Sequence, residues 1–107
     1  MRMFHSALAA LAALSALAVA TAAAQTSDPN LARNLAATCA NCHGTQGVSQ
    51  GGTETLAGMA KETMIRKLQE FKTGAKPASI MHQLSKGYSD EQLALIAGWF
   101  ADQKAPK

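Results

Sequence analysis

Cysteine is scarce in this sequence of 107 residues: Cys39 and Cys42 are the only two, and they lie in one short stretch. Two neighbouring cysteines cannot tie distant segments together, so a disulfide framework is excluded as the source of stability. Aromatic residues are also few, at five, and bulky apolar residues are spread thinly after residue 24. A chain this short and this poor in apolar bulk needs a further contribution to its core.

The first 24 residues have the composition of an export leader. Arg2 precedes an Ala/Leu run over residues 7–19, and residues 22–24 are the small residues that a leader peptidase requires. We expect a cleaved signal peptide over residues 1–24 and a periplasmic mature chain over residues 25–107. An uncleaved membrane anchor is disfavoured, because the apolar run is shorter than the roughly 20 residues of a membrane span.

The expected mature chain has nearly equal numbers of positive and negative side chains. Without Arg2 it has nine Lys and Arg against seven Asp and Glu, a formal charge of +2. This balance indicates neither a nucleic acid nor an anionic membrane surface as a partner. The lysines in the middle of the chain are dispersed, and we expect a solvated surface for them: Lys61, Lys67, Lys72, Lys76 and Lys86.

The spacing of apolar residues predicts helices and no strands. A first helix is expected over residues 29–38, capped by Asp28. A second is expected over residues 60–72, where Gly74 supplies a left-handed end. Residues 44–55 between them are rich in Gly, Thr and Ser and predict an irregular loop.

The C-terminal third contains the best-defined of these helices. Ser89 and Gln92 form a capping-box pair, and apolar residues then share one helical face as far as about Gln103. Before it, residues 79–84 form a short apolar segment that favours one or two helical turns. We therefore expect one all-α domain of three to four helices over residues 25–107.

The stretch from Cys39 to His43, Cys-Ala-Asn-Cys-His, matches the attachment signature of a covalent haem, C-x-x-C-H. Two intervening residues let the thiols reach two vinyl groups on one porphyrin edge, and the next residue then faces the iron. We expect one haem c bound through Cys39 and Cys42, with His43 as the proximal iron ligand. Such a cofactor supplies the missing core, and its two propionates bring the formal charge near zero. A place at the rim of the haem edge is the alternative to a solvated surface for some of the dispersed lysines.

Two other kinds of site use similar residues. A structural zinc site needs four ligands, and only His82 remains in the mature chain as a fourth donor, at no familiar spacing. A thioredoxin-like dithiol needs a preceding strand in a β-α-β setting, whereas this motif follows an expected helix. Haem attachment is therefore the favoured interpretation.

The second axial ligand of the iron has four candidates: Met59, Met64, Met81 and His82. A thioether sulfur opposite histidine raises the potential relative to a second imidazole. Met64 belongs to an apolar helical stripe and Met59 to a loop, so both are better explained as core or wall contacts. Met81 lies 38 residues after His43, between two expected helices, which lets the chain cross to the other haem face. We predict Met81 as the ligand and His82 as a partly exposed surface histidine.

Several stretches resemble small single-haem c-type cytochromes: residues 39–47 (CANCHGTQG), 56–58 (LAG), 68–74 (LQEFKTG), 80–81 (IM) and 86–91 (KGYSDE). Within that family the chain is most similar to the cytochrome subunits of flavocytochrome c sulfide dehydrogenases. The resemblance implies a compact all-α cytochrome c fold around one haem, with Met81 as axial ligand. It also implies electron transfer without bond chemistry on a substrate, and a flavoprotein sulfide dehydrogenase subunit as partner.

The chain departs from this family at Glu54. A proline often stands at that place and offers its carbonyl to the proximal histidine. A backbone carbonyl remains here, so we expect the hydrogen bond to persist, while the rigidity of the loop is left open. Two functional alternatives also remain: a free periplasmic carrier for a terminal oxidase or another redox enzyme, and a ligand-binding or peroxide-reducing haem protein with an open iron position.

Overall fold

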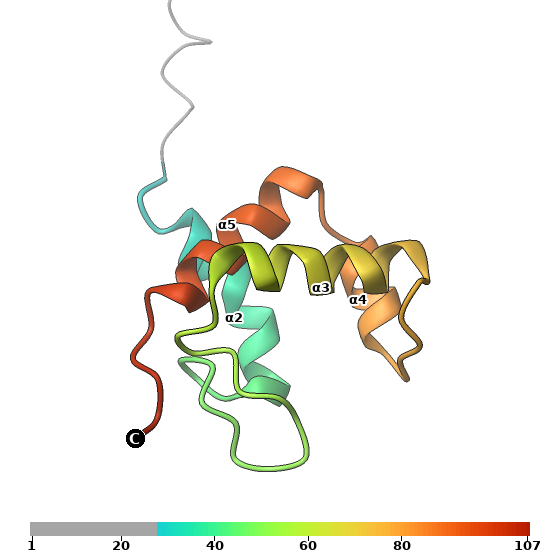
Figure 1. The fold of residues 1–107 in the computed structure, drawn as a ribbon. Helices are drawn as coiled ribbons and strands as arrows, with labels where there is room; N and C mark the ends of the chain where they lie inside the picture. Colours follow the sequence, from blue (N-terminus) through green and yellow to red (C-terminus); the bar gives the residue numbers. More distant parts are fainter. Residues whose placement is uncertain (1–27) are drawn as a thin grey trace, which may run out of the picture.

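A computed structural model describes residues 28–107, which form four helices and no strand (Figure 1). The helices are α2 (Leu31–His43), α3 (Lys61–Thr73), α4 (Met81–Lys86) and α5 (Asp90–Ala101). Helix α3 lies across the molecule, packing against α5 near one end and against α4 at the other, while α2 packs against α5. The expected all-α class is confirmed. The expected leader, residues 1–24, and its cleavage site lie outside the described residues.

Helix α2 differs from its predicted bounds at both ends. Asn30, rather than Asp28, is the residue before the helix, and Asp28 Oδ1 instead accepts a hydrogen bond from the Asn30 N–H (2.8 Å). At the other end the helix continues past Thr38 and contains the whole C-x-x-C-H motif. Residues 39–43 contain no Gly or Pro to stop it. Gly44 ends the helix with a φ of +89°, where a side chain would collide with the backbone of the following turn.

Helices α3 and α5 match their predictions closely. The first ends at Gly74 in the left-handed conformation, with a φ of +82°. At the start of α5, Ser89 Oγ accepts from the Gln92 N–H (3.1 Å) and Gln92 Oε1 accepts from the Ser89 N–H (2.9 Å). The predicted capping box is confirmed. The predicted short segment, residues 79–84, overlaps α4, which begins at Met81 and ends at Lys86.

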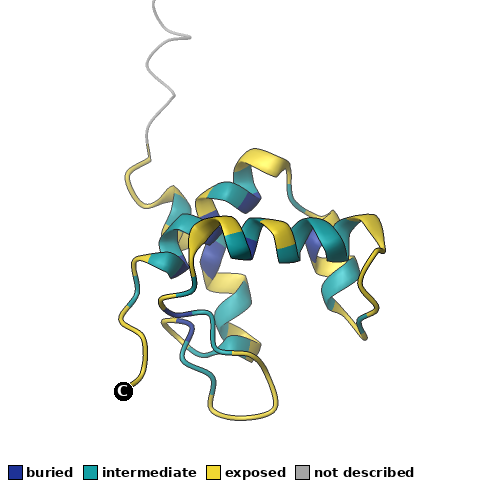
Figure 2. Ribbon diagram, viewed as in Figure 1, coloured by how far each residue is buried: buried dark blue, intermediate teal, exposed yellow. Residues whose placement is uncertain are grey.

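The hydrophobic core lies where α2, α3 and α5 meet (Figure 2). Its buried residues are Ala36, Met64, Leu93, Ile96, Ala97 and Phe100. Phe100 is fully buried, and the Trp99 ring packs edge-on against it with 5.0 Å between ring centroids. Two of the six core residues are alanines, so this core is small, and α4 contributes none of it.

The segment between α2 and α3 is irregular, as predicted. The backbone N–H groups of Leu56 and Ala57 both donate to the carbonyl of Gly47 (2.7 and 3.1 Å), and the Gly58 N–H donates to the carbonyl of Phe100 (3.0 Å). These bonds join the last part of the loop to the turn that follows α2, and they also fix it to α5. In the part of the chain described here, none of the helices has the length and apolar character needed to cross a membrane.

Candidate haem site

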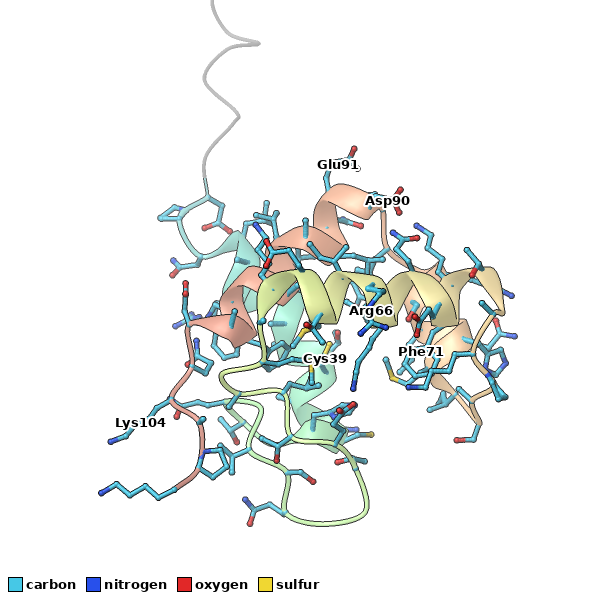
Figure 3. All side chains as sticks on the ribbon, viewed as in Figure 1. Cys39, Arg66, Phe71, Asp90, Glu91 and Lys104 are labelled. Atoms are coloured by element: carbon cyan, nitrogen blue, oxygen red, sulfur yellow. The ribbon has the colours of Figure 1, made fainter. Side chains whose placement is uncertain are left out.

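A cavity of about 340 Å³ lies between α2, α3 and α4. Its walls are mostly apolar and come from these helices, the loop after α2, the segments flanking α4, and α5. The wall residues include Cys39, Cys42, His43, Leu56, Met59, Met64, Leu68, Phe71, Ile80, Met81, Leu84, Ser85, Tyr88, Leu93 and Ile96. In Figure 3, Cys39 and Phe71 lie below α3, Cys39 toward α2 and Phe71 toward α4.

The four residues predicted from the sequence as haem-binding all line this cavity. Cys39, Cys42 and His43 come from the last two turns of α2, and Met81 is the first residue of α4. The structure thus brings together residues that lie about 40 positions apart in the chain. His82 does not line the cavity, and its Nδ1 atom is buried without a hydrogen-bond partner.

The His43 ring is oriented by the loop after α2. Its Nδ1 atom lies 2.6 Å from the backbone carbonyl oxygen of Glu54. A carbonyl oxygen only accepts, so Nδ1 carries the proton and the lone pair of Nε2 remains for a metal. The hydrogen bond expected at Glu54 is confirmed. The adjacent Thr53 Oγ1 donates to the carbonyl of Cys42 (2.7 Å), so two successive loop residues hold the end of the motif.

The two thiols lie in different surroundings. Cys39 is partly buried and Cys42 is exposed. Burial raises the pKa of the Cys39 thiol above its usual range, although a side-chain hydrogen bond with Thr38 opposes the effect. Without haem, the Cys39 thiol is therefore harder to ionise than an ordinary cysteine.

The zinc and thioredoxin interpretations lack their structural requirements in residues 28–107. No group of three or more His, Cys, Asp or Glu side chains is gathered there in a way that would hold a metal ion. The same residues contain no strand, whereas a thioredoxin-like dithiol follows one.

Three methionines line the cavity, and their packing differs. Met64 is 3% exposed and belongs to the core cluster, and Met59 packs against that cluster. Met81 is partly exposed and lies outside the cluster. Of the three methionines, Met81 is thus the one that does not pack against the core.

Ser85 is the one buried polar residue in the described chain, with 1% of its surface exposed. Ser85 lines the cavity, one helical turn after Met81, and its buried hydroxyl has no hydrogen-bond partner. Buried polar atoms in proteins nearly always have a partner, so an orphaned hydroxyl facing a cavity fits a site that a bound group completes. The apolar walls, the oriented imidazole and this hydroxyl together fit a haem.

Polar contacts join the walls of the cavity beside α5. The Tyr88 hydroxyl and Thr38 Oγ1 are 2.6 Å apart, which joins the segment before α5 to α2. Lys72 of α3 donates to the carbonyl of Tyr88 (2.7 Å) and to Asp90 Oδ1 (3.0 Å). These contacts link three elements that are distant in the sequence, and sequence reasoning missed them.

The expectation of a solvated surface is wrong for two of the five lysines. The side chains of Lys67 and Lys72 are only 24% and 26% exposed, and each is paired with a carboxylate. Lys67 lines the cavity, whereas Lys72 reaches the segment before α5, and the low exposure of both shows that their apolar stems are covered. Their partners, Glu54 and Asp90, lie 13 and 18 residues away, a separation that no local sequence pattern reports.

The model of the cytochrome c family matches residues 30–102, from the start of α2 to the end of α5. The chain belongs to the cytochrome c family. Proteins of this family carry covalently bound haem c and transfer electrons, and Cys39 and Cys42 have the spacing that attachment requires. Membership of this family thus indicates electron transfer as the role of residues 30–102.

Three curated relatives support the same class. The chain is 35% identical over 68 residues to the cytochrome subunit of sulfide dehydrogenase from Chlorobaculum tepidum, covering 64% of this chain and 62% of the relative. It is 36% identical over 70 residues to cytochrome c4 from Pseudomonas aeruginosa, covering 64% of this chain and 35% of that protein. It is 31% identical over 77 residues to the thiosulfate dehydrogenase electron acceptor of Stutzerimonas stutzeri, covering 70% of this chain and 36% of the relative. The matched part therefore spans from about a third to three fifths of the length of these relatives.

Proposed function

We propose that the chain carries one haem c through thioether bonds from Cys39 and Cys42, with His43 and Met81 as the two axial ligands of the iron. The main support is the shared cavity, whose walls contain all four side chains. When bound, the haem supplies an iron that alternates between two oxidation states. The protein has to hold that iron in one coordination and keep its surroundings apolar.

The residues around the cavity serve these tasks in different ways. The Glu54 carbonyl keeps the proton on His43 Nδ1 and directs Nε2 into the cavity. Met81 is preferred over Met59 and Met64 because those two are held by the core. The apolar walls limit water around the iron, which stabilises the less charged, reduced state.

An absorption spectrum tests the ligand assignment. Ferric haem with a thioether ligand shows a weak long-wavelength sulfur-to-iron band, and we expect this band to disappear in Met81→Ala. The matched control is Met59→Ala, which removes another methionine from the same cavity and should keep the band. Persistence of the band in Met81→Ala would refute the assignment. An open iron position in the unaltered protein would favour a ligand-binding or peroxide-reducing protein.

We also propose that residues 1–24 are removed on export and that the cytochrome works in the periplasm. Support comes from Arg2, the Ala/Leu run and the three alanines that end at residue 24. Mass spectrometry of the native protein tests this proposal, since it should report a chain starting at Gln25 with one haem added. A mass that retains residues 1–24 would contradict it.

For the electron donor, we propose a flavoprotein sulfide dehydrogenase subunit. Support comes from the likeness to the Chlorobaculum tepidum cytochrome subunit. The second candidate is a free carrier that serves a terminal oxidase or another redox enzyme, which the likeness to the thiosulfate dehydrogenase electron acceptor favours. In both cases one haem edge must stay open to a redox partner.

Native purification separates these two candidates. A complex that contains flavin and haem, in which sulfide bleaches the flavin and then reduces the haem, supports the dehydrogenase proposal. A cytochrome that elutes alone at native abundance and low salt leaves only the free carrier.

A further inference from the structure

Glu54 contacts two different elements at once. Its backbone carbonyl accepts the hydrogen bond from His43 Nδ1 at the end of α2 (2.6 Å). Its carboxylate forms an ion pair with the ammonium group of Lys67, in the middle of α3. One loop residue therefore connects the ring that faces the cavity with the helix that forms the cavity wall.

The charges around the cavity make this pair distinctive. Among the described residues that line the cavity, Glu54 and Lys67 are the two that carry a formal charge, apart from the titratable His43. The Lys67 side chain is 24% exposed, whereas the Glu54 side chain is 52% exposed. A largely covered ammonium group beside apolar walls needs a counter-charge, and Glu54 supplies it.

The loop around Glu54 has no regular secondary structure. Residues 44–60 contain no helix or strand, and four glycines lie between residues 44 and 52. The residues on both sides of Glu54 make other hydrogen bonds: Thr53 Oγ1 donates to the carbonyl of Cys42, and Thr55 Oγ1 accepts from the Ser49 N–H (3.1 Å). None of these bonds reaches α3, so the Glu54 carboxylate is the group of this loop that is paired with that helix. Lys67, in contrast, lies in the middle of the 13-residue helix α3. Of the two partners, Lys67 has the more fixed backbone.

We infer that Lys67 is a positioning residue for the His43 imidazole: its ion pair with the Glu54 carboxylate holds the carbonyl that orients the ring. The inference rests on the proposed function, because it takes His43 as an iron ligand. It adds that α3 controls the orientation of that ligand through a side-chain pair, in a loop that has no proline to stiffen it.

Two single variants of the haem-loaded protein test the inference. Lys67→Met removes the ammonium group and keeps an apolar stem, while Glu54→Gln removes the carboxylate and keeps the backbone carbonyl. Both should speed hydrogen exchange at the Leu56 and Ala57 amides by about two- to five-fold, the range expected for losing a partly exposed ion pair. Both should also shift the His43 ring-proton resonances of the ferric protein. A charge-swapped double variant, Glu54→Lys with Lys67→Glu, should return both readouts toward those of the unaltered protein.

The matched control is Glu70→Gln. It breaks the Arg66–Glu70 ion pair (2.8 Å) on the same helix and makes the same change of charge as Glu54→Gln. Neither residue of that pair lines the cavity. The His43 resonances and the loop amides should therefore stay unchanged in this variant, which separates a local effect on the ring from a general change of charge.

The possible outcomes are distinct. Unchanged His43 resonances in both single variants would overturn the inference. A shift in Lys67→Met without one in Glu54→Gln would also overturn it, since Lys67 would then act on the haem directly. Failure of the proposed function would appear differently, because the unaltered protein would then lack covalent haem or His43 resonances shifted by the iron.

Discussion

Helices α4 and α5 are neighbours in the chain, but they are stabilised by different contacts. Four of the 12 residues of α5 are buried, and a complete capping box starts the helix. Helix α4 has six residues, no capping side chain and one buried residue, the polar Ser85. The flanking Ile80 and the α4 residue Leu84 are 54% and 45% exposed, and both face the cavity. Buried residues thus hold α5, whereas α4 packs against α3 and leaves apolar side chains facing the cavity.

This difference indicates where a bound cofactor would take the place of hydrophobic core residues. A six-residue helix is too short to be stable alone, because nucleation costs more than a few hydrogen bonds return. The core of α2, α3 and α5 ends where the cavity begins. A haem bound in this cavity, as proposed above, would therefore act as the other half of the hydrophobic core.

The largest expected effect is the loss of folding when haem cannot attach. In Cys39→Ser/Cys42→Ser, expressed with residues 1–24, the small core should not offset the entropy of ordering the chain. We expect disordered circular dichroism without a cooperative transition. Asn41→Ser, an exposed change inside the same motif, should retain haem and fold. Cooperative unfolding of the haem-free chain would show that the α5 core is sufficient alone.

A smaller effect separates the two helices in the haem-loaded protein. Phe100→Ala, in α5, should lower the free energy of unfolding by about 3–5 kcal/mol, because it empties a fully buried site. Leu84→Ala, in α4, should lower it by less than about 2 kcal/mol, because that side chain is nearly half exposed. Urea unfolding measures both values. Equal losses would mean that α4 has as much of a protein core as α5.

The capping box contributes a further difference. Ser89→Ala removes the hydroxyl that accepts from the Gln92 N–H and should lower the free energy of unfolding by about 1 kcal/mol. Ser79→Ala, close to the uncapped start of α4, should change it by no more than about 0.5 kcal/mol. The same urea measurements apply. A Ser79 variant that loses as much as the Ser89 variant would point to an unrecognised cap on α4.

The smallest effect is a pH dependence at the start of α5. Hydrogen bonds from Gln69 and then Lys72 hold the pKa of Asp90 below its usual range. A carboxylate with a lowered pKa in the folded state adds stability above its unfolded pKa, and this stability is lost as the pH falls through the folded pKa. Asp90→Asn should therefore flatten the acid side of the stability profile. Glu91→Gln makes the same change of charge in the same turn of α5 and is the control for that change. A variant Asp90→Asn with an unchanged profile would contradict the assignment.

The parts of the fold that the sequence predicted are those fixed by local contacts. The capping box at Ser89 and the glycine end at Gly74 involve residues within four positions of each other, so the pattern and the structure coincide. The predicted end of α2 at residue 38 is wrong, because the C-x-x-C-H motif is part of the helix. Nothing in residues 39–43 disfavours a helix, and the first breaker is Gly44.

The residues of the candidate haem site were predictable from the sequence, but the contacts that position them were not. The C-x-x-C-H motif and the position of Met81 indicated four residues that the fold brings to one cavity. The predicted roles of Met59 as a wall contact and of Met64 as a core residue are also confirmed. The pairing of Glu54 with Lys67 depends on how the loop meets α3, which only the folded chain determines.

The contact between Thr38 and Tyr88 joins residues 50 positions apart, one before the haem motif and one just before the last helix. During synthesis the motif and His43 emerge first, and Met81 and Tyr88 follow only after some 40 further residues have been added. Both thiols and His43 are therefore present in the growing chain before the cavity wall that contains Met81 and Tyr88. We expect the Thr38–Tyr88 contact to be among the last to form, and the second half of the chain to close the cavity over a cofactor that the first half already holds.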